Sequence, residues 1–166
     1  MQKEKENKKP FDKLGFTHLE TEELVGNLNI LLANYHLHYQ KLRNFHWNVT
    51  GPDFFDVHEK LEEQYNLTQE QIDLVAERIR IFGKNPVSNL SEYLKMSKIK
   101  EVKKIPKARD MMLEILNDFE ILHSFFVDTI DSAAEIGDSG TEDMIIQFMR
   151  KMEKTHWMFT SFVKEE

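Results

Sequence analysis

The chain has 166 residues and a net charge of −7, with 40% hydrophobic and 31% charged residues. This length suits one domain with a sizeable core, and the absence of cysteine excludes disulfides and thiolate metal sites. No apolar run approaches the roughly 18–20 residues that span a bilayer, and the N-terminus lacks the apolar segment of a signal peptide. We therefore expect a cytoplasmic protein without membrane contact, in which any metal binds through imidazole or carboxylate.

The first ten residues differ in charge from the rest of the chain. They carry four lysines against two glutamates, whereas the remainder has 18 basic and 27 acidic side chains. An acidic body repels the phosphates of DNA, so nucleic-acid binding is not the default expectation. We expect residues 1–16 to form a flexible tail and residues 17–166 to form the folded domain. Weak DNA contact and nucleoid association through the tail are the alternative to a solubilising role.

The first half of the chain predicts two long helices. Apolar residues recur with a helical period over residues 20–47. A turn with glycine and proline at 50–53 ends that pattern, and Asp53 is placed to cap the next helix. The second helix is expected to run to about Phe82, because Gly83 follows as a helix terminator.

The second half of the chain predicts a long connection and two more helices. The connection spans residues 86–106 and includes one short helix in the stretch SNLSEYLKM. The third helix is expected at 107–136 and the fourth at 140–164, opened by a capping box of Ser139 and Glu142. Four helices of about 25–30 residues with one long crossover predict an all-α, ferritin-like four-helix bundle, with a short extra helix in the second-to-third connection.

Two histidines flank the turn between the first two helices, in NFHWNVTGPDFFDVHEKLEE. His46 and His58 each lie six residues from Pro52. In a helical hairpin the two imidazoles would therefore come level and could share a metal ion. Glu62 follows His58 by about one helical turn and adds a carboxylate on the same face.

The second helix carries a stripe of candidate metal ligands that does not face the core. At about 100° per residue, with His58 at 0°, Glu62 lies near 40°, Asp73 near 60° and Glu77 near 100°. The apolar stripe of this helix is centred roughly 110° away from the ligand stripe. The ligands should therefore point sideways, towards something other than the core of their own bundle.

The rise along the helix divides this stripe into two half-sites. Glu62 and Asp73 are separated by about 16 Å at roughly 1.5 Å per residue, which is too far for one ion. His46, His58 and Glu62 would form one half-site, and Asp73 and Glu77 the other. Two such helices packed antiparallel about a two-fold axis would join each half to the opposite half of the partner. One isologous interface would then hold two complete sites.

Two Glu-x-x-His pairs offer a competing metal site. Glu120 with His123, and Glu153 with His156, match an element of di-iron bundles. That design also needs a glutamate inside each of the other helices, and the first helix has acids only in its first turn. Both histidines fall on apolar stripes, so we interpret them as hydrogen-bonded core or interface residues. A monomeric di-iron oxygenase built on these four residues stays the alternative.

The sequence resembles a known family. FHWNVTGPDFFDVHEKLEE, followed by Asp73, Glu77 and Arg78, closely resembles the signature of the Dps proteins, or mini-ferritins. GDSGTEDMIIQFMRKMEKTHWMF is similar to that family's last helix, and the resemblance covers about residues 20–164. It implies a ferritin-like fold, a hollow dodecamer and ferroxidase centres between two-fold-related subunits. The implied iron ligands are His46, His58 and Glu62 of one subunit, with Asp73 and Glu77 of its partner.

The resemblance also bears on individual acids. The family commonly has aspartate at position 62, so Glu62 keeps the carboxylate but reaches one methylene further. Dps proteins line a three-fold iron-entry pore with acids near the start of the last helix. By that resemblance Asp143 would line such a pore, and Asp138 is a second candidate.

The donor set and the resemblance together predict a function. Imidazole and carboxylate without sulfur suit Fe(II) and admit Zn(II) as a substitute. We therefore expect an iron-sequestering ferroxidase whose five ligands are its catalytic residues. The resemblance implies hydrogen peroxide as the oxidant, Fe(III) storage inside the shell and protection of DNA from oxidative damage. A DNA-compacting structural protein with an incidental metal site is the alternative.

Overall fold

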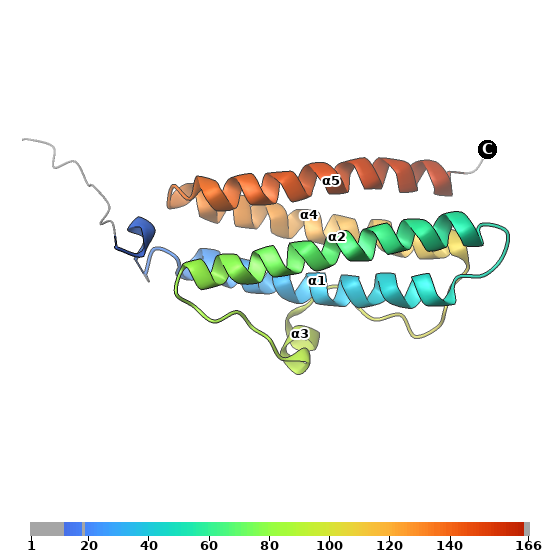
Figure 1. The fold of residues 1–166 in the computed structure, drawn as a ribbon, viewed down its shortest axis with the longest axis horizontal. Helices are drawn as coiled ribbons and strands as arrows, with labels where there is room; N and C mark the ends of the chain where they lie inside the picture. Colours follow the sequence, from blue (N-terminus) through green and yellow to red (C-terminus); the bar gives the residue numbers. More distant parts are fainter. Residues whose placement is uncertain (1–11, 18, 165–166) are drawn as a thin grey trace, which may run out of the picture.

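The computed structural model describes residues 12–17 and 19–164, and this part of the chain folds as a helical bundle (Figure 1). Its α-helices are α1 (Glu22–Asn48), α2 (Phe54–Ile81), α3 (Leu90–Met96), α4 (Ala108–Glu135) and α5 (Ser139–Val163), preceded by a 3-10 turn at Asp12–Gly15. No described residue lies in a strand, so the all-α prediction is confirmed. The long helices begin and end within two residues of the predicted ranges.

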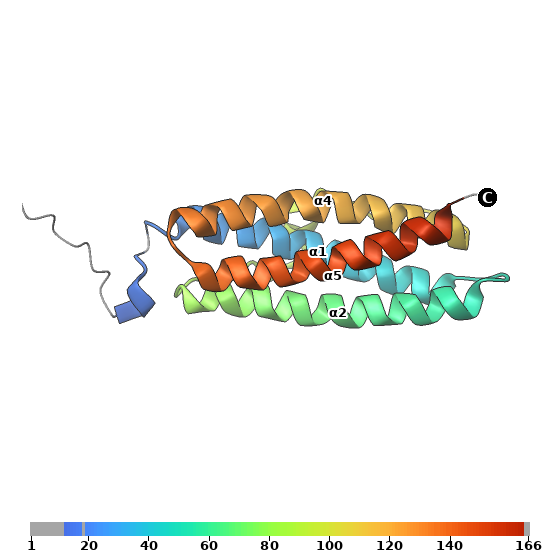
Figure 2. The same ribbon diagram turned by 90° about the horizontal axis from the view of Figure 1, so that it is seen from above.

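Two helical hairpins and one crossover connect the bundle. Figure 2 shows α2 and α5 along one side, with α1 and α4 along the other. The α1–α2 and α4–α5 connections are short and lie at opposite ends, whereas the α2–α4 connection runs the length of the bundle and contains α3 (Figure 1). In the first hairpin, Gly51 has a φ of 105°, which glycine adopts without the strain of a Cβ. The predicted topology, including the extra helix, is confirmed.

The core forms where the apolar stripes of the four long helices meet. Aromatic rings fill its centre: Tyr35 of α1 lies 6.1 Å from Phe126 of α4 and 6.2 Å from Phe148 of α5, measured between ring centroids. All three side chains are buried. Aromatic contacts of this kind add to the free energy gained by burial and leave the middle of the bundle closely filled.

A buried charged network fixes α1 against α4. The carboxylate of Asp118 accepts a hydrogen bond from His38 Nδ1 at 2.9 Å and one from Lys41 Nζ at 2.7 Å. None of the three residues is more than 5% exposed. Removing charges from water is costly unless they are paired and hydrogen-bonded, so this network is satisfied only in one register of the two helices.

Two asparagines of α1 hold the crossover in place. Asn29 Oδ1 accepts the backbone N–H of Val87 at 2.9 Å, before α3. Asn34, which is fully buried, accepts the backbone N–H groups of Lys98 at 2.9 Å and Ile99 at 3.1 Å, after α3. These bonds satisfy backbone donors that would otherwise be buried without partners, and they position α3 on the outside of α1.

The start of α5 differs from the predicted capping box. Its N-cap is Asp138, and Ser139 is already the first helical residue. The Asp138 carboxylate accepts the backbone N–H of Thr141 at 3.2 Å and also its hydroxyl group. Ser139 was the wrong choice because aspartate one residue earlier caps equally well, and only Asp138 is also paired with Arg78 of α2.

Arg78 lies across the first turn of α5 and joins it to α2. Its guanidinium pairs with Asp138, and its Nε donates to the Thr141 hydroxyl at 2.8 Å. A Cβ built on Gly140 would lie only 2.9 Å from the arginine Nη2. Glycine at this position therefore allows the close approach that the ion pair requires.

The packed part of the chain begins before the predicted domain boundary at residue 17. Phe16 lies edge-on against Phe82, with ring centroids 5.4 Å apart and an interplanar angle of 85°. Residues 1–11 lie outside the described residues, so the tail prediction stays a prediction for that segment. None of the helices described is long and apolar enough to cross a membrane.

We expect Asp138→Ala to lower the free energy of unfolding by about 2–4 kcal/mol. Loss of an N-cap costs about 0.5–2 kcal/mol, and removing one partner of a buried ion pair costs up to about 3–5 kcal/mol. Urea denaturation at fixed protein concentration measures the change. Asp143→Ala is the control, because that exposed acid on the same helix should matter by only about 0.5 kcal/mol. Equal effects of the two changes would contradict this account of the cap.

Candidate metal centre

The α1–α2 hairpin brings His46 and His58 face to face. His46 lies in the last turn of α1 and is 7% exposed, whereas His58 lies near the start of α2 and is half-buried. Their ring centroids are 3.8 Å apart, and the ring planes are inclined by 20°. The predicted levelling of the two imidazoles across the turn is therefore confirmed.

Each imidazole is held by the backbone of the other residue. His46 Nδ1 donates to the carbonyl oxygen of His58 at 2.8 Å, and His58 Nδ1 donates to the carbonyl oxygen of His46 at 2.9 Å. Because a carbonyl oxygen can only accept, Nδ1 carries the proton in both rings. In the neutral imidazoles Nε2 then has a free lone pair. A backbone carbonyl on the second ring nitrogen is a common arrangement for histidines that bind metals.

Glu62 completes a cluster of three ligands. One ligand atom from each of His46, His58 and Glu62 lies within 4.8 Å of the other two. Within the described part of the chain, no other set of three histidine or acidic side chains gathers so closely. Two imidazole nitrogens and one carboxylate oxygen suit a divalent first-row metal, and three ligands on one side leave coordination positions open.

Aromatic side chains that sequence reasoning did not assign to the site surround the pair. Phe54 stacks on His58 with centroids 4.9 Å apart, and Tyr65 lies edge-on to His46 at 5.2 Å. Burial raises the pKa of the Tyr65 phenol, and the negative charge of Glu62 raises it further. Tyr65 follows His58 by about two helical turns. This spacing places the two side chains on the same face of α2 and could have indicated that Tyr65 lies near the site.

Asp73 and Glu77 lie farther along α2 and do not join this cluster. Both side chains are exposed on the continuous helix. The separation of about 16 Å between Glu62 and Asp73 follows from the rise of an unbroken helix. A single chain therefore presents two separate groups of ligands, and the joining of the two groups across a two-fold interface stays a prediction.

The two acids predicted for an entry pore differ in their surroundings. Asp143 is exposed and accepts a hydrogen bond from Gln147 Nε2 at 2.7 Å. Asp138 is 2% exposed, and its carboxylate is occupied by the cap of α5 and by Arg78. Asp138 is therefore buried and already paired at the start of α5, so it is not an exposed acid of the kind that lines a pore.

The Glu-x-x-His residues do not form an interior site. Glu120, His123, Glu153 and His156 line one groove between α4 and α5. His123 is exposed and His156 is half-buried, so neither is a core residue of the single chain, and the interface interpretation stays a prediction. Both histidines lie at the edge of an apolar stripe rather than at its centre. An oxygenase centre inside the bundle is not supported by this placement.

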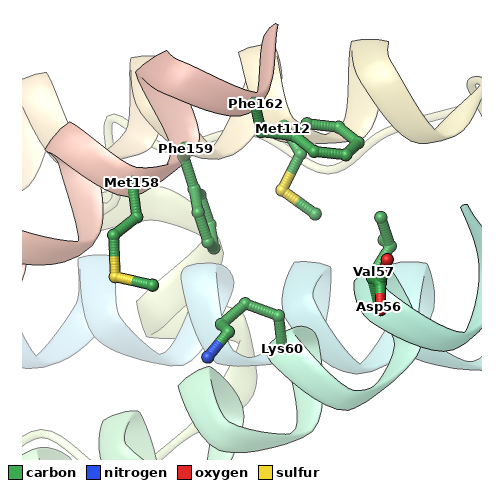
Figure 3. A pocket seen from close by; sticks show the side chains of 7 residues that line it. All are labelled: Asp56, Val57, Lys60, Met112, Met158, Phe159 and Phe162. Atoms are coloured by element: carbon green, nitrogen blue, oxygen red, sulfur yellow. The ribbon is translucent and has the colours of Figure 1, made fainter.

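An apolar pocket of about 170 Å³ lies between α2, α4 and α5. Figure 3 shows its lining, which is mostly thioether and aromatic. The lining residues are Asp56, Val57, Lys60, Met112, Met158, Phe159 and Phe162. A single carboxylate beside one lysine and several apolar groups does not make a set of metal ligands, so we place the candidate metal centre at the histidine pair.

The sequence and the fold are similar to those of known proteins. A family model described as a ferritin-like domain matches residues 25–166. A DNA protection during starvation protein from Brevibacillus brevis is 39% identical over 137 residues, covering 82% of this chain and 92% of that protein.

Solved structures agree with this match. The structure of Dps from Staphylococcus aureus has a TM-score of 0.84 at 40% identity, covering 87% of this chain and 97% of that one. Dps from Vibrio cholerae has a TM-score of 0.88 at 37% identity, covering 90% and 94%. The Vibrio cholerae protein is described as a member of a superfamily of ferritin-like diiron-carboxylate proteins.

We expect both histidines of the candidate centre to be protonated on Nδ1 and not on Nε2 when they are neutral. Solid-state NMR of metal-free protein with ¹⁵N-labelled histidine, recorded near pH 8, distinguishes the two nitrogens. His46→Ala and His58→Ala each remove one signal and so assign the pair. Protonated Nε2 atoms in either ring would contradict the reciprocal hydrogen bonds.

Proposed function

Because this chain belongs to the Dps family of ferritin-like proteins, we propose that it oxidises Fe(II) and stores the Fe(III) inside a homo-oligomeric shell. The observation that carries the proposal is the histidine pair with Glu62, whose ligand atoms lie within 4.8 Å of one another, while the Nδ1 hydrogen bonds leave Nε2 of each neutral ring with a lone pair. The diiron-carboxylate description of the Vibrio cholerae relative supports iron as the metal.

The complete ferroxidase site is proposed to need two chains. Three ligands hold one ion loosely, and the exposed Asp73 and Glu77 have the charge to complete the site. Two α2 helices crossing antiparallel about a two-fold axis would bring the acids of one chain to the histidines of the other. By family resemblance, six such dimers would assemble into a dodecamer.

The ligand types suit the change in oxidation state. Imidazole binds Fe(II) well, whereas hard carboxylate oxygens favour Fe(III). Two Fe(II) ions supply the two electrons that convert one hydrogen peroxide and two protons into two waters. This pairing avoids the one-electron reduction of peroxide that releases hydroxyl radical. It thereby accounts for the protection of DNA that the Brevibacillus relative's name describes.

The surroundings of the site have defined tasks in this proposal. The Nδ1 hydrogen bonds keep Nε2 directed at the ion, and Phe54 and Tyr65 shield the rings from water on one side. Asp143, exposed near the start of α5, is the acid we propose for the entry path of Fe(II). Zn(II) would compete for the same ligands without being oxidised.

DNA binding is a separate matter from DNA protection. The acidic body repels phosphate, and only the basic first ten residues offer an attractive charge. Many copies of such a tail on one shell would add their weak contacts through multivalency. We therefore propose protection through iron chemistry as the main function, with DNA contact as a weaker contribution.

The proposed shared site is tested with two complementary double mutants. One carries His46→Ala with His58→Ala, and the other carries Asp73→Ala with Glu77→Ala. Each alone should oxidise Fe(II) with peroxide slowly, because every site lacks one half. Co-refolded mixtures should recover part of the wild-type rate, followed by absorbance, since mixed dimers contain one intact site and one doubly damaged site.

The control for this experiment is a mixture of each mutant with itself, treated in the same way. Native mass spectrometry of the dimers shows whether mixed species form. Verified mixed dimers that stay as inactive as the separate mutants would rule out a site shared between chains. A stable monomer with full activity in light scattering would exclude the oligomeric proposal as well.

The role of the tail is tested by removing residues 1–10. We expect weak DNA binding by the full chain in a gel shift at low salt, little binding near 150 mM salt, and none by the truncated chain, because the interaction is electrostatic. Iron oxidation should be unchanged by the truncation. Tight binding that survives removal of the tail would show that another surface contacts DNA.

A further inference from the structure

A second set of metal-binding side chains lies between α4 and α5, away from the α1–α2 hairpin. It lines a groove of about 350 Å³. The lining residues are Phe119, Glu120, His123, Met152, Glu153 and His156. Phe119 is only 4% exposed and Met152 is half-buried, so an apolar base underlies two carboxylates and two imidazoles.

Aromatic contacts fix the register of the two helices around this groove. The α4–α5 connection is a tight hairpin, so the helices run antiparallel (Figure 1). Phe119 of α4 lies 6.0 Å from Phe159 of α5, and Phe126 lies 6.5 Å from Phe148, measured between ring centroids. These two contacts bracket the groove and determine which residues face each other between them.

In this register each glutamate faces a histidine. Glu120 comes level with His156, and His123 comes level with Glu153. The two levels are about 4.5 Å apart, because three residues separate them along each helix. The i, i+3 spacing also places the glutamate and histidine of each helix on one face. Four potential donors from two helices therefore line one groove.

The four side chains are available to a ligand in the single chain. Glu120, His123 and Glu153 are exposed, and His156 is half-buried. Across the described residues no hydrogen bond or ion pair occupies any of the four. Their ligand atoms are not gathered within 4.8 Å, unlike those of the histidine pair. Binding would therefore require these side chains, which no polar contact among the described residues holds, to turn towards one another.

We propose that this groove binds one divalent transition-metal ion of the Zn²⁺ class. His123 and His156 supply imidazole nitrogens, and Glu120 and Glu153 supply carboxylate oxygens. Two nitrogens with one or two oxygens match the donor number and type that such ions prefer. The apolar base formed by Phe119 limits water on one side, which strengthens the attraction between the ion and the carboxylates.

This site is separate from the histidine pair, and it places the four Glu-x-x-His residues at a surface groove rather than in a di-iron centre in the bundle core. Its ligands come from α4 and α5 of one chain, so it does not depend on the proposed two-fold interface. It lies outside the bundle and uses no acid of α1 or α2, unlike a di-iron centre in a bundle core. Binding without oxidation is sufficient for the proposal, which therefore stands independently of the ferroxidase function.

Zinc binding to the assembled protein tests the proposal. The parent protein carries His46→Ala with His58→Ala to disable the first centre. We expect calorimetric titration near pH 7.5 to show about one Zn²⁺ per chain with micromolar or tighter affinity. Adding His123→Ala with His156→Ala should weaken this binding at least tenfold. Co²⁺ in place of Zn²⁺ should give visible absorption bands that the same two changes remove.

Two further variants separate coordination from general charge. Glu120→Gln with Glu153→Gln keeps side-chain size and should also weaken zinc binding. Asp131→Asn with Glu135→Gln removes the same charge from exposed positions of α4 and should leave binding unchanged. The proposal is overturned if the parent binds no zinc in this range, if loss of both histidines changes nothing, or if the charge control weakens binding equally. Size measurement confirms that all variants assemble.

Discussion

The reciprocal hydrogen bonds between His46 and His58 are the constraint on which the candidate metal centre depends. They cross the hairpin that joins α1 to α2 and are satisfied only when both helix ends lie at one level. The His46 carbonyl is among the last four of α1, which lack a partner within the helix. The imidazole of His58 therefore completes the end of α1 and is oriented by the same bond. One hydrogen bond, from His58 to the His46 carbonyl, therefore both terminates α1 and orients a metal ligand.

The interior of the bundle explains why the candidate metal centre lies at its edge. In di-iron bundles, carboxylates point inward to hold the ions. Here the buried carboxylate of Asp118 is already neutralised by Lys41 and hydrogen-bonded to His38, and Tyr35 fills space nearby. These buried polar groups fix the register of α1 against α4. The candidate ligand acids of α2, Glu62, Asp73 and Glu77, are all exposed on the outside of the bundle.

Helical periodicity and turn residues were sufficient to predict the bundle, the extra helix and the meeting of His46 with His58, because each depends on local spacing. Features decided by tertiary contacts were missed. Asp138 rather than Ser139 caps α5, and Arg78 of α2 pairs with it. The local sequence around Ser139 does not indicate this contact, because Arg78 is distant along the chain. His123 lies at the margin of an apolar stripe, where periodicity cannot separate buried from exposed. The proposed joining of Asp73 and Glu77 to a second chain stays a prediction, because it depends on a surface outside the single protomer.

The close approach of Arg78 to Gly140 has a consequence for how this sequence can evolve. Glycine in the middle of a helix costs about 0.5–1 kcal/mol relative to alanine, and at Gly140, the second residue of α5, the cost is smaller. Any Cβ here would displace a guanidinium that Asp138 and Thr141 hold. Substitutions at positions 78, 138 and 140 are therefore expected to be coupled. Loss of the Arg78 side chain would remove the steric objection to a Cβ at position 140.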